Sequence, residues 1–417
     1  MKKHLLALSA AAVLLAPQTV GAEGFSINEW SAEGFAMGGA RMFAENDAAN
    51  MAYNPASLTK IQGEVAKISA TYISPHGKYK VDKSMAGAQV TGSREPEYGH
   101  NRVHPAWVPG SYYVKQLNDK EWLGFGAYSR FGNSCQFEPG SLPGVNNTSA
   151  KLNGMSIGVN YAKKLDSKWS ASLGAEINYA WLQMDKTLPT GMDGKMQIEG
   201  ESYALGWNAA ANYAFDDKNE VGIVYRSAVN HSMEANVRDY GYTGYGFTDA
   251  YGCVTLPESV MIGYGHKFND KTRVELNGTW TRWSRFDKFP ISFNDNPAAP
   301  NPKNWKDGWR YAIGVEHKLS DKYSLLAGIA YDESAIPDYY EDGDTLGADF
   351  MVPTGTRTTF TIGTQYHDDR QTLALAIGYM KVGDLHIGPE HTTGLYDKAH
   401  MYDSYTKLVS ISYQYNF

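Results

Sequence analysis

Apolar and polar residues alternate along most of this chain, with a period of two. At the C-terminal end, Val409, Ile411, Tyr413, Tyr415 and Phe417 point to one face, and the residues between them are polar. This alternation is typical of a β-strand with one apolar face. Further stretches repeat it, for example "MSIGVNYA", "WSASLGAEINYAWLQ", "YSLLAGIAY" and "TLALAIGYM". The pattern predicts an all-β protein.

Six short polar clusters divide the alternating stretches. They lie at 118–120, 166–168, 216–219, 269–271, 320–322 and 368–370, and their basic residues are spaced by 48, 50, 53, 51 and 48 residues. Asn and Asp favour tight hairpin turns because their side chains bond to the nearby backbone. Six hairpins contain twelve strands, and one further strand at each end gives a prediction of 14.

The segments between the hairpins are long and rich in Gly, Pro, Asn and Tyr. Examples are residues 132–150, 233–256, 287–304 and 335–355. Short turns at one end and long loops at the other are typical of an outer-membrane β-barrel, with turns in the periplasm and loops outside. An even strand number then predicts that both termini are periplasmic. A propeller is the rival architecture for this period, but it requires a repeated blade motif, and only the turns repeat here.

The hydropathy of the chain agrees with a barrel. No stretch of 18 apolar residues follows the N-terminus, and the mean hydropathy is −0.44, so a helical membrane protein is excluded. A barrel remains compatible with this value because every second strand residue faces a polar lumen. The last strand is expected to close the barrel against the first. Its terminal Phe417 is similar to the signal by which the barrel-assembly machinery recognises its substrates.

The first 22 residues have the features of a secretory signal peptide: two lysines, an apolar run from Leu5 to Ala16, and small residues at Val20 and Ala22. Its removal changes the net charge from −7 to −9. An acidic exported chain is a poor candidate for nucleic-acid binding. We expect a monomer surrounded by outer-membrane lipid and lipopolysaccharide.

Residues 23–62 do not alternate, and we predict that they form a separate, partly helical segment ahead of a barrel at 63–417. Apolar residues recur there at irregular helical spacing, and Pro55 ends the last helical turn. Such a segment lies either in the periplasm or inside the lumen. Its many Gly and Ala residues favour close packing inside, so we expect a plug, or hatch.

Motifs along the whole mature chain resemble the outer-membrane long-chain fatty-acid transporter family of FadL type. They are "NEWSAEGF" and "NDAANMAYNPASLT" in the hatch, followed by "GWNAAANY", "YRSAV", "LPES", "TRWSRF", "KDGWR" and "GIAYDESAIP". The resemblance implies a 14-stranded barrel plugged by the hatch. It implies energy-independent uptake of hydrophobic molecules through loop capture, lumen binding and hatch-gated release through the barrel wall. Neither an enzymatic activity nor a cofactor is expected.

The same resemblance indicates where to look for the binding and gating residues. The family signature Asn54, Pro55 and Ala56 is expected to hold the hatch near a wall opening beside a kinked third strand. Gly124 and Gly126 in "WLGFGAYSRF" permit such a kink. The alternative is that these two glycines only make room for the hatch.

Inward-facing cations are the candidates for binding a carboxylate. The alternation places Arg226 and Arg310 on the lumen face, and extending it beyond the strand adds Lys306. A fatty acid needs an apolar slot for its tail and one or two cations for its head group. The alternative is structural pairing of these cations, for example with Asp307 or with acids of the hatch. Phe25 is expected to touch the ligand, because in the family the extreme N-terminus reaches into the barrel.

Cys135 and Cys253 are the two cysteines. Both are expected in extracellular loops of a chain that folds through the oxidising periplasm, which predicts a disulfide between them. His100 and His104 have helical metal-ligand spacing, but Pro105 directly after them disfavours a helix that carries both, so no metal site is expected. No zinc-site spacing, phosphate loop or nucleophile elbow is present in the sequence.

The sequence leaves the substrate open between a fatty acid and an aromatic or aliphatic hydrocarbon. A general porin and an adhesin-like surface protein are the further alternatives.

Overall fold

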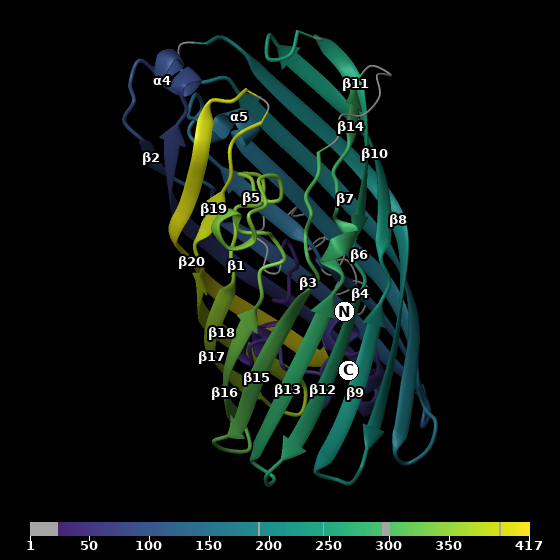
Figure 1. Cartoon of the computed structure of the whole chain (residues 1–417). Coiled ribbons are helices and arrows are strands. Elements are labelled where there is room, and N and C mark those ends of the chain that lie inside the picture. Colours follow the sequence, from purple (N-terminus) through teal and green to yellow (C-terminus); the bar gives the residue numbers. More distant parts are fainter. Residues whose placement is uncertain (1–23, 191, 245, 294–300, 392) are drawn as a thin grey trace.

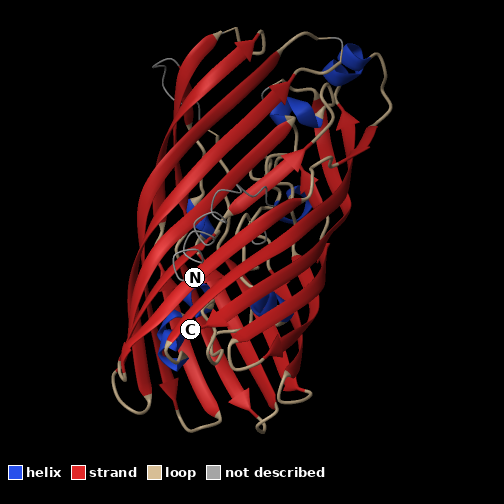
Figure 2. Ribbon diagram, turned by 180° about the vertical axis from the view of Figure 1, so that it is seen from behind, coloured by secondary structure: helices blue, strands red, loops and turns tan. Residues whose placement is uncertain are grey.

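The computed structural model describes residues 24–190, 192–244, 246–293, 301–391 and 393–417 (Figure 1). The predicted signal peptide, residues 1–22, lies outside this range. Tilted strands surround a lumen, with short turns at one end and long loops at the other (Figures 1 and 2).

The wall is a closed antiparallel barrel of 14 strands, as predicted. In spatial order they are β1 (Glu64–Lys83), β3 (Ala106–Asn118), β4 (Glu121–Tyr128), β6 (Ser149–Lys164), β7 (Trp169–Thr187), β8 (Lys195–Ala214), β9 (Asn219–Arg226), β12 (Ser259–Lys267), β13 (Thr272–Thr281), β15 (Gly308–Lys318), β16 (Tyr323–Asp332), β17 (Arg357–His367), β18 (Gln371–Val382) and β20 (Tyr396–Asn416). The last strand closes on the first, from Val65 opposite Asn416 to Lys83 opposite Tyr396. Closure leaves no open sheet edge to lipid.

Six further strands of the described residues extend the wall at the loop end. They are β2 (Glu97–His100) on β1, β5 (Gly132–Gln136) on β6, β10 (Val229–Tyr240) on β8, β11 (Phe247–Leu256) on β10, β14 (Ile291–Phe293) on β11, and β19 (Leu385–Ile387) on β20. The loops also contain α4 (Met85–Thr91), α5 (Pro143–Asn147), η2 (Trp283–Arg285) and α6 (Tyr339–Asp342).

The six predicted turns are all present, and their polar side chains close them. Asp166 Oδ1 accepts hydrogen bonds from the amides of Lys168 and Trp169 at 2.7 and 2.8 Å, and Asn269 Oδ1 accepts from Lys271 at 2.9 Å. The C-terminus lies at this end, where the amide of Phe417 donates to the carbonyl of Glu64 at 2.9 Å. Among the described residues, no helix has the length and apolar character needed to cross a bilayer.

The N-terminal segment lies within the barrel (Figure 1). It contains α2 (Ala32–Ala36), α3 (Asn50–Tyr53) and η1 (Pro55–Lys60), and nearly all residues from 24 to 61 are buried. We call residues 24–62 the hatch.

Ion pairs join the hatch to the wall near the turn end. Lys67 of β1 binds Glu33 at 2.9 Å and Asp47 at 2.7 Å, and Arg41 binds Glu316 of β15 at 3.3 Å. Removing one partner of such a buried pair costs about 3–5 kcal/mol.

The third wall strand is interrupted at residues 129–131, between β4 and β5, and the start of the hatch fills the interruption. Ser26 forms an isolated bridge with Phe131, the amide of Ile27 donates to the carbonyl of Arg130 at 2.9 Å, and the amide of Gly132 donates to the carbonyl of Phe25 at 2.8 Å. The extreme N-terminal part of the described chain is therefore bonded directly into the wall.

Candidate functional site

Phe25 lies in a cage of four aromatic rings. Its ring centroid is 4.8 Å from that of Trp283, 5.4 Å from Phe286, 5.6 Å from Trp305 and 6.1 Å from Phe131. Three of these contacts are edge-to-face, the arrangement that aromatic quadrupoles favour. Both indole N–H groups lack a hydrogen-bond partner among the described residues. The cage is suited to hold a flat apolar group, and the Nε1–H groups of Trp283 and Trp305 are two hydrogen-bond donors that a ligand could use.

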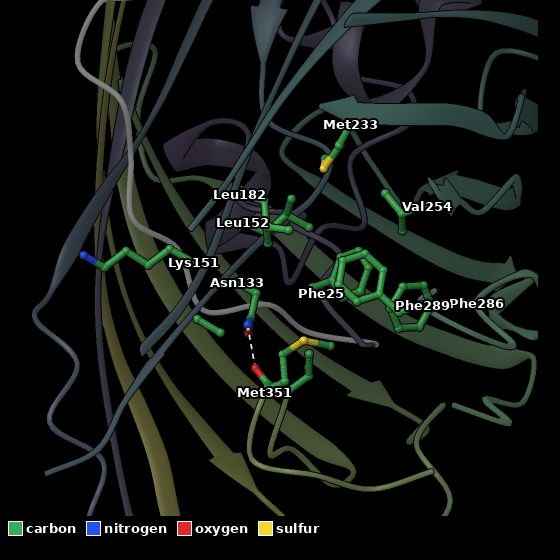
Figure 3. A pocket seen from close by; sticks show the side chains of 12 residues that line it. Phe25, Asn133, Lys151, Leu152, Leu182, Met233, Val254, Phe286, Phe289 and Met351 are labelled. Carbon is green, nitrogen blue, oxygen red and sulfur yellow. Dashed lines mark hydrogen bonds between the residues drawn. The ribbon is translucent and has the colours of Figure 1, made fainter. Parts of the chain in front are cut away.

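An apolar cavity opens on the loop side of Phe25 (Figure 3). It is lined mainly by Leu152, Leu182, Met233, Val254, Phe286, Phe289, Met351 and Val352. Its volume is about 30 Å³, which leaves room for only a few water molecules. A substrate therefore enters only if side chains move.

The polar groups around this cavity are occupied or turned away. The side-chain amide of Asn133 donates to the carbonyl of Met351 at 2.8 Å, and the Lys151 side chain extends away from the other lining side chains (Figure 3). The interior consequently offers apolar contacts to a ligand.

A second cavity has a mixed polar and apolar lining that includes Phe131, one of the rings around Phe25. Ser26, Asn28, Arg130 and Arg226 contribute to its lining, and its volume is about 40 Å³. Arg130 forms an ion pair with Glu176, whereas Arg226 Nη1 lies 4.0 Å from the same carboxylate. Two guanidinium groups thus share one acid, so this group of three carries a net positive charge in a buried place.

Arg226 also binds the hatch. Its Nη1 donates to Tyr128 Oη at 2.7 Å, and its Nη2 donates to the carbonyl of Ala52 at 2.6 Å. The side chain faces inward, as the alternation predicts, and is 5% exposed. One side chain thus both lines the cavity and binds α3, so a ligand that contacts Arg226 also affects how α3 is held.

Arg310 faces inward too, but it lies beneath the hatch and outside both cavities. Its Nη2 donates to the carbonyl of Gly38 at 2.6 Å, and its Nε pairs with Asp332 at 3.0 Å. A Cβ on Gly39 would come within 3.0 Å of the guanidinium, so the hatch packs directly on it. The contacts of Arg310 correspond to the alternative interpretation of the sequence, in which an inward-facing cation is paired structurally within the protein.

The prediction that Lys306 faces the lumen is wrong. Strand β15 begins only at Gly308, so the alternation does not extend back to residue 306, and the side chain of Lys306 is 57% exposed. It forms an ion pair with Asp342 of α6, and this hydrogen bond lowers the pKa of the Asp342 carboxyl. The buried lysine of this loop is Lys303, which pairs with Asp349. The structure therefore does not bring Lys306 and Arg310 together.

Asn54, Pro55 and Ala56 form the start of η1. Asn54 Oδ1 caps the helix by accepting from the amide of Ala56 at 3.1 Å, and Asn54 Nδ2 donates to Asn212 Oδ1 of β8 at 2.7 Å. Ala56 is fully buried in a cluster with Phe43 and residues of the wall. The motif fixes the end of the hatch to the wall, and its gating role stays a prediction.

Gly124 and Gly126 lie in a regularly paired part of β4, and the interruption of the strand begins at residue 129. A Cβ on Gly124 would lie 2.4 Å from Met51 Sδ, and one on Gly126 would lie 3.3 Å from Met51 Cε. The geometry corresponds to the alternative in which these glycines make room for the hatch.

The predicted disulfide is absent, because Cys135 and Cys253 are both free. Cys135 is buried, and its Sγ lies 3.1 Å from the carbonyl of Phe350. Cys253 is exposed on the outer face of β11, beside Ser232. A thiol inside the barrel and a thiol outside it cannot be joined without rebuilding the wall.

The residues that surround Phe25 are not predictable from the alternation of apolar and polar residues. Phe131, Arg130 and Trp283 lie in "YSRF" and "TRWSRF", segments that interrupt the alternation at the end of a strand. An aromatic–arginine pair at the end of a strand is a signal that could have marked them, although their convergence requires the closed barrel.

Comparisons with known proteins agree on one family. The profile described as "Outer membrane protein transport protein (OMPP1/FadL/TodX)" matches residues 12–417. Outer membrane protein P1 of Haemophilus influenzae is 26% identical, with 94% of each chain covered. The long-chain fatty acid transport protein of Escherichia coli K12 is 24% identical, over 90% of this chain and 91% of that protein.

Two solved structures share the fold. A Pseudomonas aeruginosa FadL homologue superposes with a TM-score of 0.83 at 18% identity, covering 94% of this chain and all of that one. The Pseudomonas putida toluene transporter TodX superposes with a TM-score of 0.68 at 17% identity, covering 94% and 99% of the two chains. At these identities the likeness concerns the fold alone.

Proposed function

This chain belongs to the outer membrane protein transport protein family (OMPP1/FadL/TodX) and is an outer-membrane transporter of hydrophobic molecules; from this premise we propose that its substrate is a long-chain fatty acid. The observation that carries the proposal is that the consecutive residues Phe25 and Ser26 line an apolar cavity and a second cavity that contains two buried arginines sharing one acid. An amphipathic anion matches both parts, whereas a hydrocarbon uses only the first.

The tail is proposed to occupy the cavity between Leu152, Met233 and Val254, where each buried CH₂ contributes about 0.8 kcal/mol. The cavity must expand to accept a long chain. Phe25 closes it toward the hatch, so a tail that passes this level takes the place of the Phe25 ring in its cage. Substrate binding and release of the N-terminal segment are then a single event.

The head group is proposed to bind Arg130 and Arg226, with Arg310 retained as an anchor of the hatch. A carboxylate supplies the negative charge that the Arg130, Arg226 and Glu176 group lacks. A charge-assisted hydrogen bond of this kind contributes about 1.5–3 kcal/mol. The carboxylate competes with the carbonyl of Ala52 for Arg226, which couples binding to the position of α3.

An aromatic hydrocarbon is the second candidate. The cage of Trp283, Phe286 and Trp305 already holds a phenyl ring, that of Phe25. A relative of the same fold is named a toluene transporter. Such a substrate would compete only with the Phe25 ring for the cage, and its binding would not depend on Arg130.

The proposed path runs from the loops to the apolar cavity and leaves through the wall at residues 129–131, where Ser26 and Ile27 now bond to the interrupted strand. Uptake follows the concentration gradient. The long loops are proposed to face outward and both termini the periplasm, with a monomer as the transporting unit. The alternating strands and the terminal Phe417 support insertion by the barrel-assembly machinery.

Competition for uptake discriminates the candidates. Cells that lack their own transporter and express this chain would take up labelled oleate in the presence of unlabelled oleate, methyl oleate, toluene or an alkane. A fatty-acid transporter is inhibited best by oleate, and Arg130→Gln removes the advantage of oleate over its ester. Inhibition by toluene at the lowest concentration, unaffected by Arg130→Gln, would contradict the proposal.

A further inference from the structure

Four side chains form a compact group on the outer face of the barrel, where β18 and β20 pair. Tyr379 is opposite Lys407, and Lys381 is opposite Tyr405, so the two lysines lie on one diagonal and the two tyrosines on the other. The tyrosine rings are stacked, with centroids 5.6 Å apart and planes 22° apart. We call these residues the lysine–tyrosine quartet.

The two lysines of the quartet lack an ion-pair partner within the described part of the chain. Lys407 Nζ lies 5.7 Å from the ring centroid of Tyr405, and both lysines are exposed. Residues on a cross-strand diagonal are about 7–8 Å apart, and like charges this close repel each other. The nearby Asp403 is already bound to Lys78 at 2.9 Å. An anion from outside the chain would relieve the repulsion.

The position of the quartet along the wall indicates which anion. Outward-facing apolar residues occupy the same two strands on the turn side of it: Leu373, Leu375 and Ile377 on β18, and Val409 and Ile411 on β20. From Gln371 to Lys381, ten residues at about 3.3 Å each and a tilt of about 40° give a height of roughly 25 Å, which is the height of the apolar band of such barrels. The lysines therefore lie at the boundary where lipid head groups begin, and tyrosines are enriched there.

Charge on the outer wall is unevenly distributed. The opposite side of the barrel carries exposed Glu199, Glu201 and Glu234 at the loop end, with Glu234 directly opposite Glu201. The whole chain has a net charge of −7. A cationic group on this background attracts anionic lipid locally, by about 1 kcal/mol per lysine at a membrane surface.

We propose that the quartet binds the phosphate-bearing head group of an outer-leaflet glycolipid. The lysines hold the phosphate, the stacked tyrosines contact the sugar rings, and the acyl chains lie along Ile377 and Val409. The assignment to the outer leaflet rests on the proposed orientation, with the loops outside. It is independent of which molecule the lumen transports.

The test is a titration of the purified, detergent-solubilised full chain with diphosphorylated lipid A, followed by native mass spectrometry. Lys381→Gln/Lys407→Gln should weaken binding about 30-fold, as expected for two lysines at a lipid surface. Lys163→Gln/Lys195→Gln is the matched control, because both lysines are outward-facing but lie elsewhere on the wall. Heat-modifiable migration verifies that each variant is folded.

Lipid A without its phosphates should bind the wild type and the quartet variant equally weakly. Equal affinity of the wild type and the quartet variant for diphosphorylated lipid A would overturn the proposal, as would an equal loss in the control variant. Phosphatidylglycerol binding as tightly as lipid A, with the same dependence on the lysines, would overturn the glycolipid assignment. Full displacement of lipid A by inorganic phosphate would overturn the role of the acyl chains.

Discussion

Replacing Phe25 by alanine should detach the start of the hatch from the wall. The ring is 2% exposed and contacts four aromatic rings, and truncating a buried Phe costs about 3–5 kcal/mol. The remaining backbone bonds to the wall at this point, from Ile27 to Arg130 and from Gly132 to Phe25, contribute about 1 kcal/mol each. The side chain therefore contributes more to docking than the two backbone bonds together.

A loss of about 3 kcal/mol raises the population of the detached state roughly 100-fold or more, because each 1.4 kcal/mol is a factor of ten. Hydrogen exchange of the amides of Ile27 and Gly132 measures this population directly. Phe289→Ala is the matched control, since Phe289 lines the same cavity and is not among the four rings around Phe25. Exchange at both amides should accelerate about 100-fold in Phe25→Ala and stay near the wild-type rate in Phe289→Ala. Unchanged exchange in Phe25→Ala would show that the backbone bonds alone hold the segment and that the aromatic contacts contribute little to its docking.

Three further outcomes are expected. Arg310→Met should destabilise the hatch by about 3–5 kcal/mol, because it leaves the buried Asp332 without its partner, and hydrogen exchange in α2 should accelerate. Lys306→Met should leave exchange in α2 unchanged, because Lys306 is exposed. Equal effects of the two substitutions would show that burial of Arg310 does not stabilise the hatch. Ala56→Trp, in a fully buried cluster, should lower uptake while the barrel still inserts and migrates in heat-modifiable form, and loss of the barrel itself would make this stretch a folding element instead. A maleimide should label Cys253 in the folded protein and Cys135 only after denaturation, and failure of either thiol to react in denatured, unreduced protein would show that the cysteine is oxidised.

The barrel follows from the sequence because its two determinants are local. The strand period is visible within ten residues, and turns such as the one at Asp166 depend on hydrogen bonds spanning two or three residues. Inward placement of Arg226 and Arg310 follows from the same period. The strand number then needs only a count of the turns.

The site is less predictable because it is built where the period stops. Extending the alternation from β15 back to Lys306 fails, since an irregular loop has no fixed side-chain period. The same limit applies to Cys135 and Cys253, which lie in β5 and β11. Both strands fall within segments that the sequence indicates to be loops, so the sequence does not predict that one cysteine faces inward and the other outward.

The aromatic cage is the extreme case of this limit. Phe25 and Trp283 are separated by more than half of the chain, and their contact depends on the hatch entering the lumen and on the break in the third strand. Neither feature has a periodic signal. Sequence similarity supplied the expectation that Phe25 reaches the ligand, and the structure supplies the partners that give this expectation a physical basis.

If hydrophobic substrate passes through the apolar cavity beside Phe25, a charge placed in that cavity should block its passage. Leu152 lines the cavity and is 9% exposed, whereas Leu346 is 40% exposed in a loop and serves as the matched control. The measurement is uptake of labelled oleate by cells that lack their own transporter and express the wild type, Leu152→Lys or Leu346→Lys, each verified as a heat-modifiable barrel in the outer membrane. We expect Leu346→Lys to transport oleate like the wild type and Leu152→Lys to fall to the level of cells without the protein, because a buried unpaired ammonium disfavours the apolar tail of the ligand. Uptake by Leu152→Lys at the wild-type rate would show that oleate crosses the barrel by a path outside this cavity.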